Sequence, residues 1–273
     1  MSLDEFRQAN QVHWNERAHI HAASCLYDIA SYIADPHKIS DVVRFDVADL
    51  GNVSGYTLLH LQCHIGTDTL SLARLGATVT GTDFSPDAIE TARKLSADCG
   101  TPARFEVAEL YDTPHMIDER FDIVYTGVGA LTWLPDIAAW GRVVATMLKP
   151  GGMLFVRDFH PMLWTIDDRQ DTDVLVVTYP YFETQPVRFE HEYTYSDGDR
   201  LINTVNYEWN HGLGEIVMSL IDNGMQLNLL REHKIAESRH LPCMVPDADG
   251  RWRLPHGEDR LPLMYTIRAV KQG

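Results

Sequence analysis

Apolar and polar positions follow two alternating periodicities through the middle of this chain. Short segments rich in β-branched and aromatic residues predict strands over residues 57–62, 77–82, 103–107, 121–126 and 152–158. Between them, segments with apolar residues on one helical face predict helices over residues 68–76, 85–100 and 135–152. Strands that alternate with helices favour a parallel sheet that is covered by helices on both faces.

The pattern changes after Asp158. Residues 187–208 alternate polar and apolar positions around a turn at Ser196 to Asp199, which predicts a hairpin. The segments that follow predict a helix and then two strands over residues 213–224, 225–233 and 260–270. The long loop before the final strand lets these two strands pair antiparallel at the sheet edge. We therefore expect a Rossmann-like, doubly wound α/β sheet, mostly parallel with an antiparallel last strand, and a β-hairpin insertion.

Composition and charge exclude several classes of protein. The chain has 273 residues, 45% of them hydrophobic, and a formal net charge of -16 from 23 basic and 39 acidic side chains. No basic cluster is long enough to follow a phosphate backbone, so we expect no nucleic acid partner. No apolar segment approaches the ~18 residues of a membrane span, and the N-terminus lacks the apolar core of a signal peptide. The cysteines are dispersed without CxxC pairing, which predicts reduced thiols and a cytoplasmic protein.

A possible ligand site follows the first predicted strand, in the segment TLLHLQCHIGTDTL at residues 57–70. Ligands bind such sheets at the carboxyl ends of the strands. A dinucleotide would need bare backbone N–H groups for its pyrophosphate, whereas Gln62, Cys63 and His64 carry side chains here. Asp68 also places a carboxylate in the first turn of the next helix, which repels phosphate. The loop therefore favours a ligand that has a ribose but no phosphate.

Asp83 follows the second predicted strand, about twenty residues beyond this loop, where a carboxylate can accept hydrogen bonds from ribose hydroxyls. A helix-capping role beside Ser85 is the alternative. Residues 57–158 as a whole resemble the class I S-adenosylmethionine-dependent methyltransferases, in the position of Asp83 and in the LKPGG turn before the fifth strand. The resemblance places Phe84 against the adenine and Glu109 at its amino group.

The resemblance implies S-adenosylmethionine as the cofactor. Its further contacts are expected from residues near the predicted strand ends: Gln62, Cys63, His64, Gly66, Leu110 and Thr126. The loop departs from the family pattern acidic-x-Gly-x-Gly-x-Gly, because His60, Gln62 and His64 replace the acidic residue and the first two glycines. Only Gly66 remains.

The resemblance also suggests a role for the segment that precedes the first strand. Residues 1–50 are expected to form a helical lid, and residues 51–273 the methyltransferase domain with an insertion at about 160–210. Trp14 would then cover the cofactor, since an aromatic face attracts a sulfonium ion. Plain packing explains Trp14 equally well, and Trp133 has the same two interpretations.

Methyl transfer is an in-line displacement that depends mainly on positioning, with a base where the acceptor is neutral. His160 and Asp158, after the fifth strand, are the candidate catalytic residues, although His160 is also explained as a loop histidine bonded to backbone. We expect no metal, because residues of a strand end and its loop, such as His60, Cys63 and His64, seldom converge.

The favoured function is methyl transfer to a small-molecule acceptor. An NAD-linked oxidoreductase and a non-catalytic cofactor-binding protein are the alternatives, the second suggested by the lost glycines. The tyrosines of the predicted hairpin could line an acceptor pocket, pack in the core or join two subunits in a homodimer.

Overall fold

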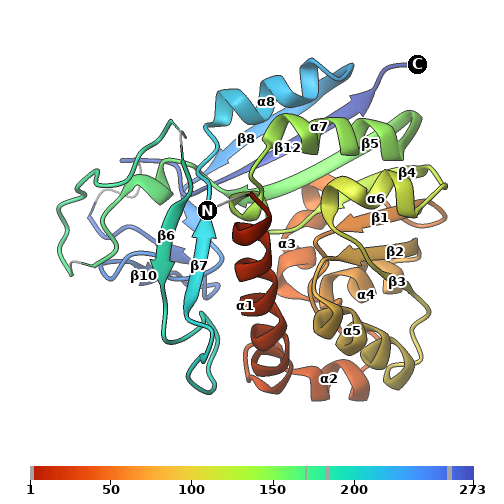
Figure 1. Ribbon diagram of the computed structural model, residues 1–273. Helices are drawn as coiled ribbons and strands as arrows, with labels where there is room; N and C mark the ends of the chain where they lie inside the picture. The colour runs from red at the N-terminus through yellow and green to blue at the C-terminus, as the bar shows by residue number, and fades with distance from the viewer. Residues whose placement is uncertain (1–2, 170, 183–184, 257–259) are drawn as a thin grey trace.

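The computed structural model describes residues 3–169, 171–182, 185–256 and 260–273. A seven-stranded sheet with the order β3-β2-β1-β4-β5-β12-β8 forms its centre (Figure 1). The strands are β1 (Thr57–Leu61), β2 (Thr78–Asp83), β3 (Arg104–Val107), β4 (Phe121–Thr126), β5 (Leu148–Phe159), β8 (Met225–His233) and β12 (Met264–Lys271). Strands β1 to β5 are parallel, whereas β12 is antiparallel to both of its neighbours, β5 and β8. The predicted fold class and the antiparallel edge are confirmed.

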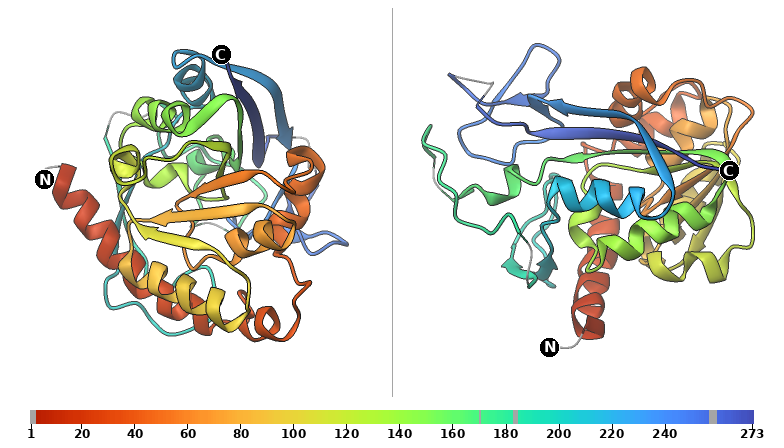
Figure 2. Two further views of the ribbon diagram at one scale, coloured as in Figure 1. Left: turned by 90° about the vertical axis from the view of Figure 1, so that its right-hand side faces the viewer. Right: turned by 90° about the horizontal axis from the view of Figure 1, so that it is seen from above.

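Helices cover both faces of the sheet, as the right-hand view of Figure 2 shows. The helices are α1 (Leu3–Ala23), α2 (Ile29–Ala34), α3 (Asp41–Leu50), α4 (Thr67–Arg74), α5 (Pro86–Asp98), α6 (Thr113–Met116), α7 (Ile137–Met147) and α8 (Leu213–Ile221). Leu59 of β1 packs in the core beneath α7 and α8, while Leu58 faces the core beneath α3 and α4. This alternation of buried apolar residues on both sides of β1 is typical of a parallel strand.

The LKPGG turn lies in a strand, contrary to the predicted helix over 135–152. Helix α7 ends at Met147, and β5 begins at Leu148, which pairs with Phe121 before the register shifts. Pro150 cannot continue a helix because it has no N–H group to donate, and Gly151 adopts a left-handed φ of 76°. The helix therefore ends before this turn, whereas the sequence prediction extended it to residue 152.

The predicted hairpin is present as β6 (Val187–Glu190) paired antiparallel with β7 (Val205–Glu208). The turn at Ser196 to Asp199 lies in the longer connection between them. Asp197 there accepts a hydrogen bond from the backbone N–H of Cys25, 3.0 Å away, so this connection lies against the N-terminal segment.

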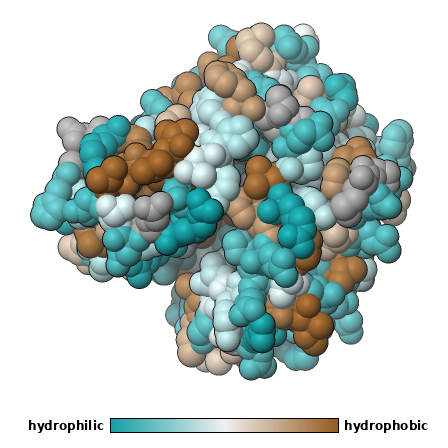
Figure 3. All heavy atoms as spheres, turned by 60° about the vertical axis from the view of Figure 1, so that its left-hand side comes forward, coloured by the Kyte–Doolittle hydropathy of each residue, from teal (hydrophilic) through white to brown (hydrophobic). Residues whose placement is uncertain are grey.

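Short elements complete the fold. A three-stranded sheet, which the sequence analysis missed, is formed by β9 (Ile235–Ala236), β10 (Val245–Pro246) and β11 (Trp252–Arg253). Single turns of 3-10 helix are η1 (Leu110–Asp112), η2 (Leu131–Trp133) and η3 (Leu163–Thr165). Exposed apolar side chains gather on the lobe at the left of Figure 3. The segment before β6 has exposed apolar residues, among them Val174, Val177 and Phe182. None of the helices in the described part of the chain combines the length and the apolar character that crossing a membrane requires.

Candidate functional site

A cavity opens at the carboxyl ends of β1, β2 and β4, where the strand order reverses. Most of the residues that the sequence assigned to the cofactor line this cavity: Trp14, Gln62, Cys63, His64, Asp83, Phe84, Glu109 and Leu110. The structure thus brings together residues from α1, the loop after β1, the end of β2 and the start of η1.

The loop after β1 has a left-handed backbone at the three positions where the family pattern has glycine, although two of them carry side chains here. Gln62, His64 and Gly66 all adopt left-handed backbone conformations, with φ of 56°, 50° and 81°. Side chains other than glycine rarely take up this conformation, which costs about 1–3 kcal/mol per residue. A hydrogen bond to the loop after β4 holds this loop in place: Gln62 Nε2 donates to the carbonyl oxygen of Ala130 at 2.9 Å. The strain indicates that a particular loop shape is retained at the cavity.

Gly66 does not line the cavity but packs beneath the loop. A Cβ atom at this position would lie 2.8 Å from Cζ of Phe105 and 2.9 Å from Cβ of Ala92. Glycine therefore allows α4 to begin directly against α5 and β3. The one glycine that remains is thus the one that packing requires.

Asp83 joins the end of β2 to this loop. Its Oδ2 accepts a hydrogen bond of 2.9 Å from the backbone N–H of His64, and its Oδ1 accepts one of 2.9 Å from that of Ser85. Burial raises the pKa of Asp83 to about 6, so the carboxylate is ionised at neutral pH. A carboxylate has about four lone-pair sites, so acceptor capacity remains for ribose hydroxyls.

Glu109 is the N-cap residue of η1 and lines the cavity. Its side chain accepts a hydrogen bond of 2.7 Å from the backbone N–H of Tyr111. Burial raises the pKa of Glu109, and Nε of Arg7 lies 3.8 Å from its Oε1. Phe84 and Leu110 add apolar surface beside it. Together these residues offer a flat apolar surface with one acceptor for an amino group.

Two ionisable side chains of different character approach the bare backbone of Gly127 at the end of β4. A Cβ atom at Gly127 would lie 3.4 Å from Nε2 of His60 and 3.8 Å from Oδ2 of Asp68. Burial lowers the pKa of His60 to about 3, so this imidazole is neutral. Burial raises the pKa of Asp68 to about 6, so its carboxylate is ionised at neutral pH. The cavity therefore carries negative charge from Asp68 and Asp83 that suits a cationic ligand.

Helix α1 contributes to the wall of the cavity. The ring of Trp14 lies 5.1 Å from that of His64 and 5.1 Å from that of Trp133. Arg7 and Asn10 also line the cavity, and the sequence analysis did not name them. Their spacing with Trp14, at i, i+3 and i+7, places all three on one helical face and was the signal that could have found them.

Several candidate residues lie outside the cavity lining. Gly66 is one of them, and Thr126 is another, because it is fully buried at the end of β4. Asp158 accepts hydrogen bonds from the backbone N–H groups of Gly129 at 2.6 Å and of Leu131 at 3.0 Å. Burial raises the pKa of Asp158 to about 6. Asp158 thus shapes the loop that forms one cavity wall without reaching the cavity.

His160, the candidate base, also points elsewhere. Its Nε2 lies 3.1 Å from Oε1 of Glu232 on β8, and its Nδ1 accepts a hydrogen bond from the backbone N–H of Met162. The alternative of a loop histidine bonded to backbone fits this position better than the role of a base. Within the described residues, no three His, Cys, Asp or Glu side chains are placed to hold a metal ion.

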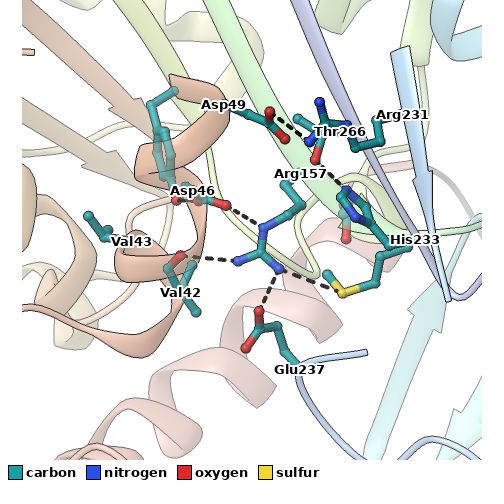
Figure 4. Close-up of polar contacts among 12 residues, drawn as sticks. Val42, Val43, Asp46, Asp49, Arg157, Arg231, His233, Glu237 and Thr266 are labelled. Carbon is teal, nitrogen blue, oxygen red and sulfur yellow. Dashed lines mark hydrogen bonds and ion pairs between the residues drawn. The ribbon is translucent and has the colours of Figure 1, made fainter. Parts of the chain in front are cut away.

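A buried ionic network lies behind the cavity (Figure 4). Arg157 of β5 donates to Asp46 of α3, and at 2.6 Å to Glu237. The hydroxyl of Tyr125 donates to Oδ2 of Asp46 at 2.5 Å. The ring of Tyr125 in turn lies 4.8 Å from that of His60 in the cavity wall. The network connects α3, β4 and β5 to Glu237, which directly follows β9.

Comparison with known proteins agrees with this geometry. Residues 58–152 match the family described as Methyltransferase domain. The ubiquinone biosynthesis O-methyltransferase of Xanthomonas euvesicatoria is 36% identical over 120 residues, which cover 44% of this chain and 50% of that protein. Its counterpart in Hydrogenovibrio crunogenus is 28% identical over 153 residues, covering 56% and 58%. The chain thus spans about half the length of the curated relatives it matches.

Solved structures share the fold over a greater length. A putative S-adenosylmethionine dependent methyltransferase from Listeria monocytogenes superposes with a TM-score of 0.60 at 19% identity, covering 85% of this chain and 97% of that one. Magnesium protoporphyrin IX methyltransferase from Synechocystis PCC 6803, solved with bound S-adenosylmethionine, gives 0.55 at 15% identity and covers 99% of both chains. At these identities the likeness establishes the fold alone.

Proposed function

We propose that this chain, whose residues 58–152 match the family described as Methyltransferase domain, is a class I S-adenosylmethionine-dependent methyltransferase that transfers a methyl group from S-adenosylmethionine to a small-molecule acceptor. The observation that carries the proposal is the position of Asp83. It lies at the end of β2 and is bonded to a loop after β1 whose left-handed backbone survives the loss of two glycines.

Each part of the cofactor has a complementary group in the cavity. Asp83 would accept hydrogen bonds from the ribose hydroxyls, and Glu109 would accept one from the adenine amino group between Phe84 and Leu110. The loop from Gln62 to Gly66 would hold the methionine part with its backbone. The negative charge of Asp68 suits a ligand that carries an ammonium and a sulfonium, and it disfavours the pyrophosphate of NAD.

The chain's own contribution to catalysis is positioning and the exclusion of water. When bound, S-adenosylmethionine supplies an activated methyl group on sulfur. Trp14, Trp133, Tyr27 and Tyr195 line the cavity and provide flat apolar surface for an acceptor. The curated relatives are named as O-methyltransferases, so acceptors with a hydroxyl group are the first to test.

Some expectations remain predictions. The role of residues 1–50 as a lid is supported by Trp14 and Tyr27, which come from this segment and line the cavity. A cytoplasmic location, the lack of a nucleic acid partner and a homodimer rest on the sequence alone. His160 and Asp158 are not part of the proposed mechanism, because neither lines the cavity.

The proposal is tested by turnover. Purified protein is incubated with methyl-labelled S-adenosylmethionine and a panel of small phenols, and transfer of label is followed together with release of S-adenosylhomocysteine. Transfer that is lost in Asp83→Ala supports the proposal. Binding of S-adenosylmethionine without transfer to any acceptor would favour the non-catalytic alternative, and binding of NAD in its place would favour the oxidoreductase.

A further inference from the structure

A buried cation lies against the aromatic wall of the cavity. Arg17 of α1 is 6% exposed, and its guanidinium carbon lies 5.0 Å from the ring centroid of Trp14 and 5.7 Å from that of Trp133. Both rings line the cavity. Arg17 itself does not line the cavity, so its guanidinium lies in the layer directly behind these two rings, three residues beyond Trp14 on α1.

Among the residues that the structure describes, Arg17 forms no ion pair with a carboxylate. In the described part of the chain no carboxylate lies within 4.0 Å of its nitrogens, and its buried Nε makes no hydrogen bond. Glu208 of β7 is close enough to act on the charge electrostatically, but its carboxylate bonds to Asn206 at 2.7 Å and to Thr132 at 3.4 Å. A buried charge without a partner is costly, although contact with two indole faces compensates part of that cost.

The surroundings keep this cation isolated from other positive charge. Four imidazoles lie within its electrostatic reach: His13, His21, His64 and His191. Burial is the largest cause that lowers the pKa of each, and the Arg17 charge lowers it further, so all four are neutral at neutral pH. The guanidinium is therefore the one fixed positive charge of this group, in a buried and aromatic environment where an anion would bind strongly.

The charges around the cavity are thus separated. Asp68 and Asp83 make the cofactor side negative, whereas the positive charge of Arg17 lies behind the side bounded by α1 and Trp133. Structural balancing by Glu208 is the competing explanation, and it predicts no preference for an anionic ligand.

We propose that Arg17 binds an anionic group, a carboxylate or a phosphate, of the methyl acceptor. This inference rests on the proposed function and specifies its substrate class as an aromatic or otherwise planar anion. The planar guanidinium can bind two oxygens of such a group, while the indole rings contact its flat part. Since the protein as a whole is strongly acidic, a buried cation is needed to admit an anion here.

The test compares two ligands that differ in charge but have nearly the same shape. Protein saturated with S-adenosylhomocysteine is titrated with benzoate and with benzamide, and phenyl phosphate serves as a second anion. We expect benzoate to bind at least about tenfold more tightly than benzamide, as for a charge-assisted hydrogen-bonded pair. Equal affinities, or no binding of either compound, would overturn the proposal.

Variants test whether Arg17 causes the preference for benzoate over benzamide. Arg17→Met is expected to abolish the preference for benzoate, while Arg17→Lys retains part of it as a point charge. Arg188→Met is the matched control, because Arg188 is on β6 and pairs with Glu190 at 3.1 Å. A preference that persists in Arg17→Met would contradict the assignment.

Two further measurements are the effect of Glu208→Gln on benzoate binding and the affinity of each variant for S-adenosylhomocysteine. If Arg17→Met does not fold, Glu208→Gln provides a second route. Burial raises the pKa of Glu208 to about 7, so at about pH 8.5 the removal of its negative charge should tighten benzoate binding several-fold. Unchanged or weaker binding in that variant would overturn the proposal. Binding of S-adenosylhomocysteine is measured first in every variant. Its absence in the unmodified protein would remove the proposed function itself, whereas its presence without an anion preference would remove only the role of Arg17.

Discussion

The imidazole rings of His21 and His64 share a hydrogen bond of 2.7 Å between Nδ1 of His21 and Nε2 of His64. Nε2 of His21 also bonds to Oγ1 of Thr194 at 2.6 Å. One side chain of α1 therefore joins the loop after β1 to the connection between β6 and β7. Tyr27 and Tyr195 reinforce this junction through their hydroxyl oxygens, 2.5 Å apart.

Replacement of His21 should loosen this junction. His21→Phe keeps a ring but leaves His64 and Thr194 without their partner, so we expect the free energy of unfolding to fall by about 1–3 kcal/mol. Affinity for S-adenosylhomocysteine should fall several-fold because the loop loses a restraint. Urea denaturation and calorimetry measure the two effects. His19→Phe on the same helix is the control, since His19 is exposed; equal losses in both variants would contradict the role of His21.

Gly66 should tolerate no side chain. Gly66→Ala combines a left-handed φ of 81° with close contacts to Phe105 and Ala92, so we expect a loss of about 2–5 kcal/mol in unfolding free energy. Gly100→Ala provides the matched control. Its φ is +60° with nothing within 4 Å of the added Cβ, and it should cost only about 1 kcal/mol. Thermal unfolding measures both losses of unfolding free energy. Equal losses in Gly66→Ala and Gly100→Ala would contradict the role of close packing at Gly66.

The network of Figure 4 predicts different costs for two arginines. Arg157→Met leaves the buried carboxylate of Asp46 without its cation, which should cost about 3–5 kcal/mol. Arg231→Met breaks a more exposed pair with Asp49, 3.0 Å apart, and should cost at most about 1 kcal/mol. Chemical denaturation distinguishes them, and a cost for Arg157→Met no larger than that for Arg231→Met would contradict this account.

Affinity for the cofactor product should depend on pH through Asp83. The pKa of Asp83 is raised to about 6 by burial, and hydrogen bonds from ribose hydroxyls favour its charged form. Protonation therefore opposes binding, and affinity for S-adenosylhomocysteine should fall by up to about tenfold between pH 8 and pH 5. Asp83→Asn should bind weakly with a smaller pH dependence, to which Asp68 still contributes. An affinity that rises towards low pH would contradict the assignment.

The sequence predicted the fold because local patterns determine it. Apolar segments with strand periodicity and helices bounded by Ser85, Pro86 or a glycine are signals within a few residues of each other. The order of the strands in the sheet was not predicted, because it depends on which distant strands pair. The two-residue strands β9 to β11 have no such local signal, so they were missed.

The sequence placed most of the cavity-lining candidates after strand ends, such as Asp83 and the loop after β1, and one, Trp14, on the N-terminal helix. The left-handed backbone at Gln62 and His64 was not predicted. Whether His160 faces the cavity depends on Glu232, which lies far along the chain on β8. Contacts of this kind depend on how distant strands pair, and no local pattern shows them.

The central claim is tested most directly by calorimetric titration with S-adenosylmethionine, S-adenosylhomocysteine and NAD. We expect micromolar binding of both sulfur compounds and none of NAD. Asp83→Ala should weaken the binding at least about tenfold, whereas Asp87→Ala, outside the cavity, should leave it unchanged. Failure of both sulfur compounds to bind the unmodified protein would contradict the proposed function.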